Sequence, residues 1–236
     1  MRTTQLLDLF LKCVQIPYLN VGEDINYAFL RKEDVLYLFF EASNGVTDWK
    51  RNFDFPAKPY KRMGKTLWFA HSGFVNAWKK LEPHLAPLIH DRRTHQIVAT
   101  GYSHGAAIAV LCHEYIWYAR ADLRPTLRSY GFGCPRVLWG LLPPSVARRW
   151  SSFSVIRNLD DLVTHLPPAC FGYRHVGTVI EIGARGTYSM IDAHRPENIA
   201  AELFAYQNSS IKTALASGSS EVNTNSLSPP RSAISR

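Results

Sequence analysis

The chain has 236 residues, of which 46% are hydrophobic and 19% are charged, and it carries a formal net charge of +8. This length and apolar content are enough to bury one sizeable core and do not call for two domains. A basic surface attracts anionic lipid, nucleic acid or acidic partners, but here the basic clusters are short and scattered and no nucleic-acid-binding motif is present. We therefore expect no nucleic-acid partner and keep peripheral contact with an anionic lipid surface as an open interpretation.

Predicted helices and strands alternate along the chain. Apolar patterning predicts helices at residues 5–15, 79–89 and 107–121 and strands at residues 35–40, 97–100, 153–158 and 176–182. A last amphipathic helix follows residue 194. This order predicts one α/β domain over residues 1–206. From residue 207 onward the chain is rich in Ser, Asn and Thr, so we expect a disordered polar tail over residues 207–236.

The N-terminal apolar run is interrupted by Asp8 and Lys12, so it lacks the pattern of a signal peptide. No apolar stretch reaches the length of a transmembrane helix, and the four cysteines show no disulfide framework spacing. We expect a cytoplasmic protein with reduced, mostly buried thiols, and unconventional export as the alternative. Metal-binding motifs and phosphate-cradling glycine loops are also missing from the sequence, which predicts no metal and no organic cofactor.

Residues 97–111 are the most informative stretch, because a strand-like run meets Gly-Tyr-Ser-His-Gly at residues 101–105 and continues as an alanine-rich helix-like run. In this context Gly-x-Ser-x-Gly is typical of a nucleophile elbow, a tight strand-to-helix turn that exposes the hydroxyl of Ser103. The turn requires neighbours that are nearly free of side chains, which the two glycines supply. The following helix directs unpaired N–H groups at the site, so the backbone N–H of His104 is a candidate donor to an oxyanion.

A serine nucleophile needs a base and an acid that orients the base. In chains with this elbow the acid follows the serine on a loop after a later strand. The strand predicted at residues 153–158 is followed by a sharp turn containing Asp160 and Asp161. One of these two aspartates is expected to be the acid, and the residues alone leave both open.

The base should follow the acid, which leaves His165, His175 and His194. His165 lies on the same loop as the acid and would have to fold back to meet both partners. His175 directly precedes a strand-like run, which favours a packing or hydrogen-bonding role. His194 begins the loop that leads into the last helix, so we predict that His194 is the base.

Four further blocks accompany the elbow. They are Phe40-Glu41-Ala42-Ser43 with Asp48-Trp49 and Asn52-Phe53 after it, His71-Ser72-Gly73-Phe74, residues 130–137 (Tyr-Gly-Phe-Gly-Cys-Pro-Arg-Val), and the loop Asn-x-x-Asp-x-Val-x-x-Leu-Pro-Pro at residues 158–168. In sequence and in order these blocks resemble the class 3 (fungal-type) lipases, from roughly residue 5 to residue 205.

The resemblance implies an α/β-hydrolase fold, with a mostly parallel central sheet and helices on both faces. It selects Asp161 rather than Asp160 as the acid, because the family's aspartate lies two residues before the valine of that loop. It agrees with His194 as the base. It also implies an oxyanion hole formed by Ser43 and the backbone N–H of His104.

The implied activity is that of a serine carboxylester hydrolase, which cleaves acylglycerols or other lipid esters through an acyl-enzyme on Ser103. A phospholipase A-type enzyme and an esterase for small esters are the near alternatives. A lipid-binding or interaction protein that keeps the fold without useful turnover stays open, because Glu41-Ala42 stands where the family usually has Arg-Gly.

Other departures from the family pattern lie in the elbow. Tyr102, His104 and Ala106 stand where His, Leu and Gly are common in the family, and Ala106 requires a local backbone without positive φ. The segment after the first block mixes aromatic and basic side chains where the family carries its lid. Trp49 and Phe53 of this segment, together with Tyr102, are candidates for contact with substrate or for a lid.

Overall fold

The computed structural model of the protein describes residues 4–22, 25–41, 56–62 and 65–216. Its helices are α1 (Thr4–Gln15), α3 (Ser72–Ile89), α4 (His104–Ala119), α5 (Pro144–Ala147) and α6 (Pro196–Ala216). Its strands are β1 (Leu19–Asn20), β2 (Asn26–Lys32), β3 (Val35–Phe40), β4 (Ala57–Arg62), β5 (Lys65–His71), β6 (Gln96–Tyr102), β7 (Arg128–Phe132), β8 (Leu138–Trp139), β9 (Phe153–Asn158), β10 (Tyr173–Arg174) and β11 (Thr178–Ile182).

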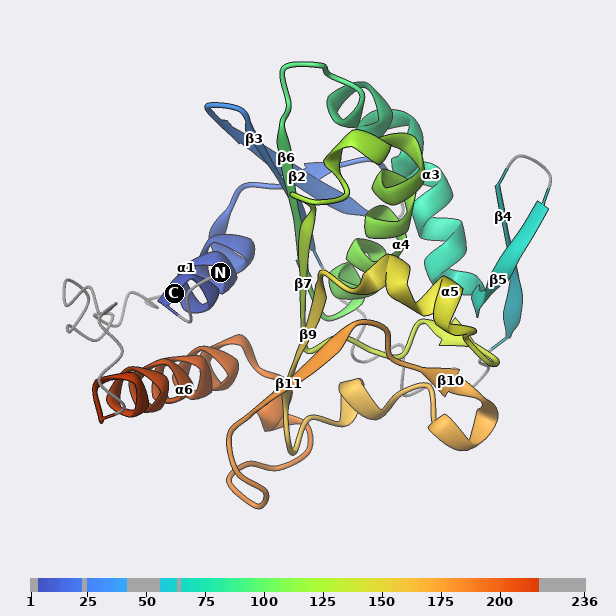
Figure 1. The fold of residues 1–236 in the computed structure, drawn as a ribbon. Helices are drawn as coiled ribbons and strands as arrows, with labels where there is room; N and C mark the ends of the chain where they lie inside the picture. The colour runs from blue at the N-terminus through green and yellow to red at the C-terminus, as the bar shows by residue number, and fades with distance from the viewer. Residues whose placement is uncertain (1–3, 23–24, 42–55, 63–64, 217–236) are drawn as a thin grey trace.

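The main sheet has seven strands in the order β1-β2-β3-β6-β7-β9-β11. Strands β3, β6, β7, β9 and β11 run parallel, and β1 and β2 are antiparallel at one edge. The predicted α/β fold with a mostly parallel central sheet is therefore confirmed (Figure 1). This arrangement brings the carboxyl ends of β6, β7 and β9 to the same edge of the sheet, where α/β proteins place their functional loops.

Helices cover the sheet on both faces, α3 and α4 on one side and α1 and α6 on the other (Figure 1). Alternate residues of a strand enter the two layers. Leu36, Leu38 and Phe40 of β3 lie in the core with α3 and α4, whereas Phe39 lies in the core with α1 and α6. Residues 35–40 read as a continuous apolar run because both faces of the strand are buried.

A second, separate sheet has four strands in the order β10-β8-β5-β4, and its neighbouring strands are antiparallel. Strand β5 leads directly into α3, and β8 follows the carboxyl end of β7. The helix predicted at residues 79–89 is longer than expected, because α3 begins at Ser72. His71 caps it, since its Nδ1 accepts a hydrogen bond from the N–H of Gly73 at 3.2 Å and so satisfies an N–H that the helix leaves unpaired.

The predicted boundary of the domain at residue 206 is too early. Helix α6 continues to Ala216, and Gln207, the first residue of the predicted tail, is only 4% exposed. The polar composition gave no sign of this continuation because most helical stability comes from tertiary packing, here the burial of Gln207, rather than from the local sequence. Residues 217–236 of the predicted tail lie outside the described part of the chain.

Within the described ranges, no helix is long and apolar enough to cross a bilayer. All four cysteines are free thiols, with Cys13, Cys112 and Cys134 buried and Cys170 exposed. Burial raises the pKa of the Cys13 thiol to about 12, so this group is protonated and unreactive near neutral pH.

Candidate active site

The Gly-x-Ser-x-Gly segment forms a sharp turn between β6 and α4. Ser103 has a φ of 56° and a ψ of −124°, a strained conformation for a residue with a side chain and the one expected at a nucleophile elbow. A Cβ at Gly101 would lie 2.2 Å from the carbonyl oxygen of Gly105, and a Cβ at Gly105 would lie 2.1 Å from that of Phe40. Backbone carbonyl groups therefore lie so close to residues 101 and 105 that only glycine fits at either position.

The alanine in place of a family glycine does not disturb this turn. Ala106 is fully buried inside α4. Among the described residues, those with a side chain and a positive φ are Glu33 and Ser103, so Ala106 carries no backbone strain of this kind.

The side chains of Ser103, His194 and Asp161 form one hydrogen-bonded row. Ser103 Oγ lies 2.8 Å from His194 Nε2, and His194 Nδ1 lies 2.7 Å from Asp161 Oδ2. Because a carboxylate oxygen accepts, Nδ1 carries the proton in this arrangement and Nε2 is left to accept the proton of the serine hydroxyl. The three residues are only 4%, 4% and 0% exposed, respectively. The network is consistent with a serine triad.

The two aspartates of the loop after β9 have different partners. Asp161 caps the 3-10 turn Leu162–His165, where its Oδ1 accepts from the N–H of Val163 at 2.8 Å and leaves Oδ2 to His194. Asp160 instead accepts from the backbone N–H groups of residues 186–188. These bonds, the one from Gly186 foremost, hold the pKa of the Asp160 carboxyl below its ordinary value. Asp160 therefore anchors a loop, and Asp161 alone of the pair bonds to the histidine.

Tyr102 contacts both the backbone and the ring of His194, and Phe10 and Asn158 make supporting contacts beside it. The Tyr102 hydroxyl donates to the carbonyl oxygen of His194, and the two rings stack with centroids 5.0 Å apart at 24°. On α1, the ring of Phe10 meets Tyr102 edge-on at 5.8 Å. Asn158 Nδ2 donates to the carbonyl oxygen of Ala193 at 3.0 Å. Tyr102, expected to contact substrate or a lid, thus supports the histidine, because the end of β6 packs beside the loop before α6.

Gly133 is a residue of the site that the sequence analysis did not single out. Its φ is +56°, and a Cβ there would lie 2.8 Å from His194 Cε1 and 3.2 Å from Asp161 Oδ2. Any larger residue would push the imidazole away from the carboxylate. The available signal was its position directly after the strand of the third block, where a glycine leaves room for a neighbour.

His104 begins α4, where the first N–H groups have no partner within the helix. The role of its backbone N–H as an oxyanion donor stays a prediction. Its side chain packs beside Phe74, with ring centroids 5.3 Å apart. Burial, and to a smaller extent the neighbouring His71, lower the pKa of His104 to about 4, so its imidazole is neutral near pH 7.

The two rival histidines have other contacts. His175 Nε2 lies 2.9 Å from the carbonyl oxygen of Thr164, and burial lowers its pKa to about 4. The pKa of His165 is also lowered, by burial first and then by the positive charges of Arg157 and Arg136. Neither is the described partner of Ser103, which is His194.

Three of the predicted site residues, Ser43, Trp49 and Phe53, lie outside the described residues, as does Ala42. The oxyanion role of Ser43 and the lid roles of the two aromatic residues stay predictions. Glu41 is described, and its Oε2 accepts a hydrogen bond from Asn26 Nδ2 at 2.8 Å. The carboxylate at this unusual position is thus paired with the adjacent strand β2.

Comparison with protein families identifies the chain. Residues 37–171, more than half of its length, match the family model described as "Lipase (class 3)". The chain belongs to the class 3 lipase family. The predicted resemblance is thereby confirmed.

Two curated proteins are similar to this class 3 lipase. A lipase from Rhizomucor miehei is 27% identical over 150 residues, and the secreted mono- and diacylglycerol lipase 1 from Fusarium solani is 30% identical over 149 residues. Each alignment covers 61% of this chain but only 41% and 42% of the respective relative. The chain therefore spans about two fifths of the length of the curated relatives it matches.

The class 3 lipase also resembles the solved structure of a triacylglycerol lipase in which a serine protease triad is said to form the catalytic centre. The two superimpose with a TM-score of 0.58 at 26% identity, over 72% of this chain and 66% of the solved one.

Proposed function

We propose that this class 3 lipase is a serine carboxylester hydrolase that cleaves acylglycerols or other lipid esters through an acyl-enzyme on Ser103. The observation that carries the proposal is the row Ser103–His194–Asp161, with distances of 2.8 Å and 2.7 Å, at a strained elbow in front of a helix N-terminus. The activities named for the similar proteins, which include mono-, di- and triacylglycerol lipases, support the substrate class.

Acylation begins when Ser103 Oγ attacks the ester carbonyl carbon while His194 Nε2 takes its proton. Asp161 stabilises the imidazolium through the proton on Nδ1. The negative charge on the tetrahedral oxygen is held by the backbone N–H of His104 and, by the resemblance, by Ser43. Collapse of this intermediate expels the alcohol, which receives its proton from His194, and leaves the acyl group on Ser103.

Deacylation repeats these steps with water. His194 removes a proton from a water molecule, which attacks the acyl carbon, and the second tetrahedral intermediate is stabilised by the same donors. Its collapse releases the carboxylic acid and returns the proton to Ser103. The buried position of Asp161 suits this cycle, because a charge shielded from water orients the imidazole strongly.

The test is covalent labelling with a fluorophosphonate, followed by mass spectrometry of the labelled peptide, on the intact protein and on Ser103→Ala and His194→Ala. We expect a label on Ser103 that is absent from Ser103→Ala and forms far more slowly in His194→Ala. Folded protein that stays unlabelled in the presence of lipid would contradict the proposal and favour a binding protein.

A substrate screen then separates the related activities. The intact protein is given p-nitrophenyl esters of two to eighteen carbons, diacylglycerol and phosphatidylcholine, with Ser103→Ala as the blank. Turnover of diacylglycerol above phosphatidylcholine supports the proposal, whereas the reverse order supports a phospholipase. Turnover confined to the shortest esters supports a small-ester esterase.

We also propose a cytoplasmic location, which the four free cysteine thiols support, because thiols stay reduced in that compartment. Fractionation of cells that express the tagged chain tests this. Recovery of the protein from the culture medium would contradict it.

A further inference from the structure

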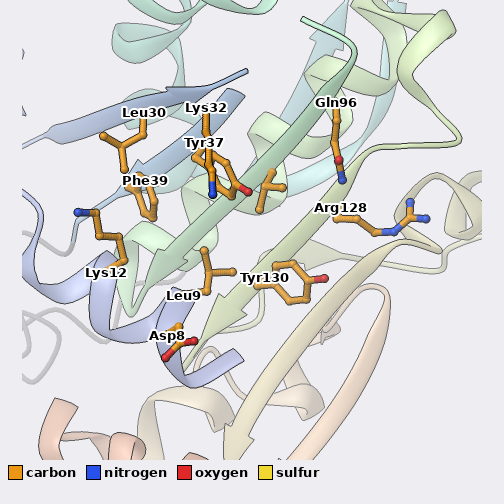
Figure 2. Close-up of a pocket in the computed structure, with 11 residues that line it drawn as sticks. Asp8, Leu9, Lys12, Leu30, Lys32, Tyr37, Phe39, Gln96, Arg128 and Tyr130 are labelled. Carbon is orange, nitrogen blue, oxygen red and sulfur yellow. The ribbon is translucent and has the colours of Figure 1, made fainter. Parts of the chain in front are cut away.

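The sheet face that carries α1 and α6 is hollowed near the amino ends of its strands. A cavity of about 510 Å³ lies there between α1 and strands β2, β3, β6 and β7 (Figure 2). Its volume is in the range of pockets that take small molecules, about 300–1,000 Å³. No step of the proposed mechanism uses it.

The cavity is separate from the hydrogen-bonded row at Ser103. Gln96 and Arg128, the first residues of β6 and β7, line it, whereas Ser103 follows the carboxyl end of β6. At about 3.3 Å per residue, the length of β6 puts roughly 20 Å between Gln96 and Ser103. A ligand held near Gln96 and a substrate at Ser103 therefore occupy different places.

Part of the lining of the cavity is apolar and recessed from the surface. Leu9, Val98 and Tyr130 line it and are only 7%, 7% and 5% exposed, while Leu30 at the mouth is 38% exposed. A helix of another protein is about 10–12 Å wide with its side chains, so it is too wide to reach these recessed residues. A single hydrocarbon chain is narrow enough to lie along them.

The rim of the cavity is cationic. Lys12, Lys32 and Arg128 contribute positive charges against the one carboxylate of Asp8. In the described part of the chain, Lys12 and Lys32 have no hydrogen-bond or ion-pair partner, and Lys32 stands over the strands between the other two (Figure 2). Figure 2 also shows Lys12 and Arg128 on opposite sides of the pocket. Cations without a partner among the described residues, at the mouth of an apolar hollow, match a ligand that combines an anionic head with a hydrocarbon chain.

We propose that this groove binds a long-chain fatty acid, with the acyl chain against Leu9, Val98 and Tyr130 and the carboxylate at the rim, attracted by the positive charges of Lys12 and Lys32. The inference goes beyond the proposed hydrolase activity, which would supply such an acid as its product. Binding in the groove does not depend on that activity, because no residue of the Ser103 row lines the cavity.

The test is a calorimetric titration of the full chain with oleate, below the micelle-forming concentration, with oleyl alcohol as the uncharged probe, because the proposed hydrolase cannot cleave an alcohol. We expect one oleate per chain in the groove and binding of oleyl alcohol weaker by roughly tenfold or more, the value of a charge-assisted contact. Equal binding of the two compounds would overturn the proposal, because it would show that the cations take no part.

Two variants locate the site. Lys12→Glu/Lys32→Glu should weaken oleate binding by roughly tenfold or more, and Leu30→Trp should fill the mouth and reduce binding at unchanged charge. The matched control Lys79→Glu/Arg92→Glu reverses two exposed cations that do not line the cavity. If the control weakens oleate binding as much as the groove variants do, oleate binding depends on net charge alone. That result would overturn the assignment to this groove.

Fluorophosphonate labelling of the same proteins keeps the two proposals distinct. If the groove variants no longer bind oleate but Ser103 is still labelled, the oleate binds in the groove. Intact protein that binds oleate but does not label at Ser103 contradicts only the hydrolase. Full oleate binding by the groove variants contradicts only the groove.

Discussion

The two ends of strand β6 differ in how closely the chain packs around them. At the carboxyl end, backbone atoms approach so closely that a Cβ on Gly101 would lie 2.2 Å from a carbonyl oxygen. At the amino end, Gln96 lines a cavity of about 510 Å³, and nearby Leu30 is 38% exposed. The difference shows that one strand can serve as a rigid mount at one end and leave space for a ligand at the other.

The largest expected effect is the loss of ester turnover when the carboxyl end of β6 is altered. Ser103→Ala should lower kcat for a p-nitrophenyl ester by at least about 10⁴-fold, because the nucleophile is lost and only binding and oxyanion contacts remain. The thermal unfolding midpoint should change little, since alanine fits the space of serine. Circular dichroism and ester turnover check both. Activity within tenfold of the unaltered chain would mean that another residue is the nucleophile.

The next effect is steric. Gly101→Ala should lower the free energy of unfolding by more than about 4 kcal/mol or prevent folding, because the new Cβ meets backbone that has nowhere to move. Gly140→Ala is the control: its φ is +94° with no atom within 4 Å of a Cβ, so it should cost only about 1–2 kcal/mol. Urea denaturation compares the two. Gly101 itself has no positive φ, so similar costs would show that the backbone near it shifts to admit a Cβ and that the close approach does not require glycine.

Low pH should lower the free energy of unfolding, because the folded chain buries His104 and His175. Burial lowers the pKa of His104 and His175 to about 4, below the value of about 6.5 for an unfolded histidine. The unfolded chain therefore binds more protons between these values, so stability is full above about pH 6.5 and falls as the pH drops toward 4. The loss should be at most about 3 kcal/mol for each histidine.

Urea denaturation at pH 7, 5.5 and 4.5 measures this loss. His175→Gln keeps a polar side chain without a titrating group and should flatten the profile between pH 6.5 and 4. An unchanged profile in that variant would mean that other groups govern acid stability.

The smallest effect concerns the support of the histidine. Tyr102→Phe keeps the ring stacked on His194 but removes the hydroxyl that donates to its carbonyl oxygen. The loss of one such bond, about 1 kcal/mol, should lower kcat roughly fivefold to tenfold with little change in KM. Tyr37→Phe, at the amino-end cavity, is the matched control and should leave both constants unchanged. A rise in KM alone would return Tyr102 to a substrate-binding role.

Much of the fold was predictable because its signals are local. The run at residues 35–40 predicted a buried strand, and the change from a strand pattern to an alanine-rich pattern around Ser103 predicted the elbow. The extent of α6 was not predictable, since residues 207–216 are polar in composition and their helical state depends on a contact such as the burial of Gln207. The start of α3 likewise depends on the cap that His71 provides.

For the candidate site, the sequence by itself indicated Ser103 as the candidate nucleophile and reduced the number of candidates for the acid and the base. The steric requirement of the Gly-x-Ser-x-Gly turn lies within five consecutive residues, so it can be recognised without a structure. The expected order of serine, acid and base along the chain left two aspartates as candidates for the acid and three histidines as candidates for the base. The loop pattern shared with class 3 lipases was needed to choose Asp161.

Only the tertiary structure decided what depends on residues far apart in the chain. Ser103 and His194 are separated by 91 positions, and His194 and Asp161 by 33. They meet because parallel strands bring their carboxyl ends to one edge of the sheet. The support of His194 by Tyr102, the space left by Gly133 and the cationic groove beside α1 arise in the same way. They are properties of packed surfaces, which no local pattern of residues encodes.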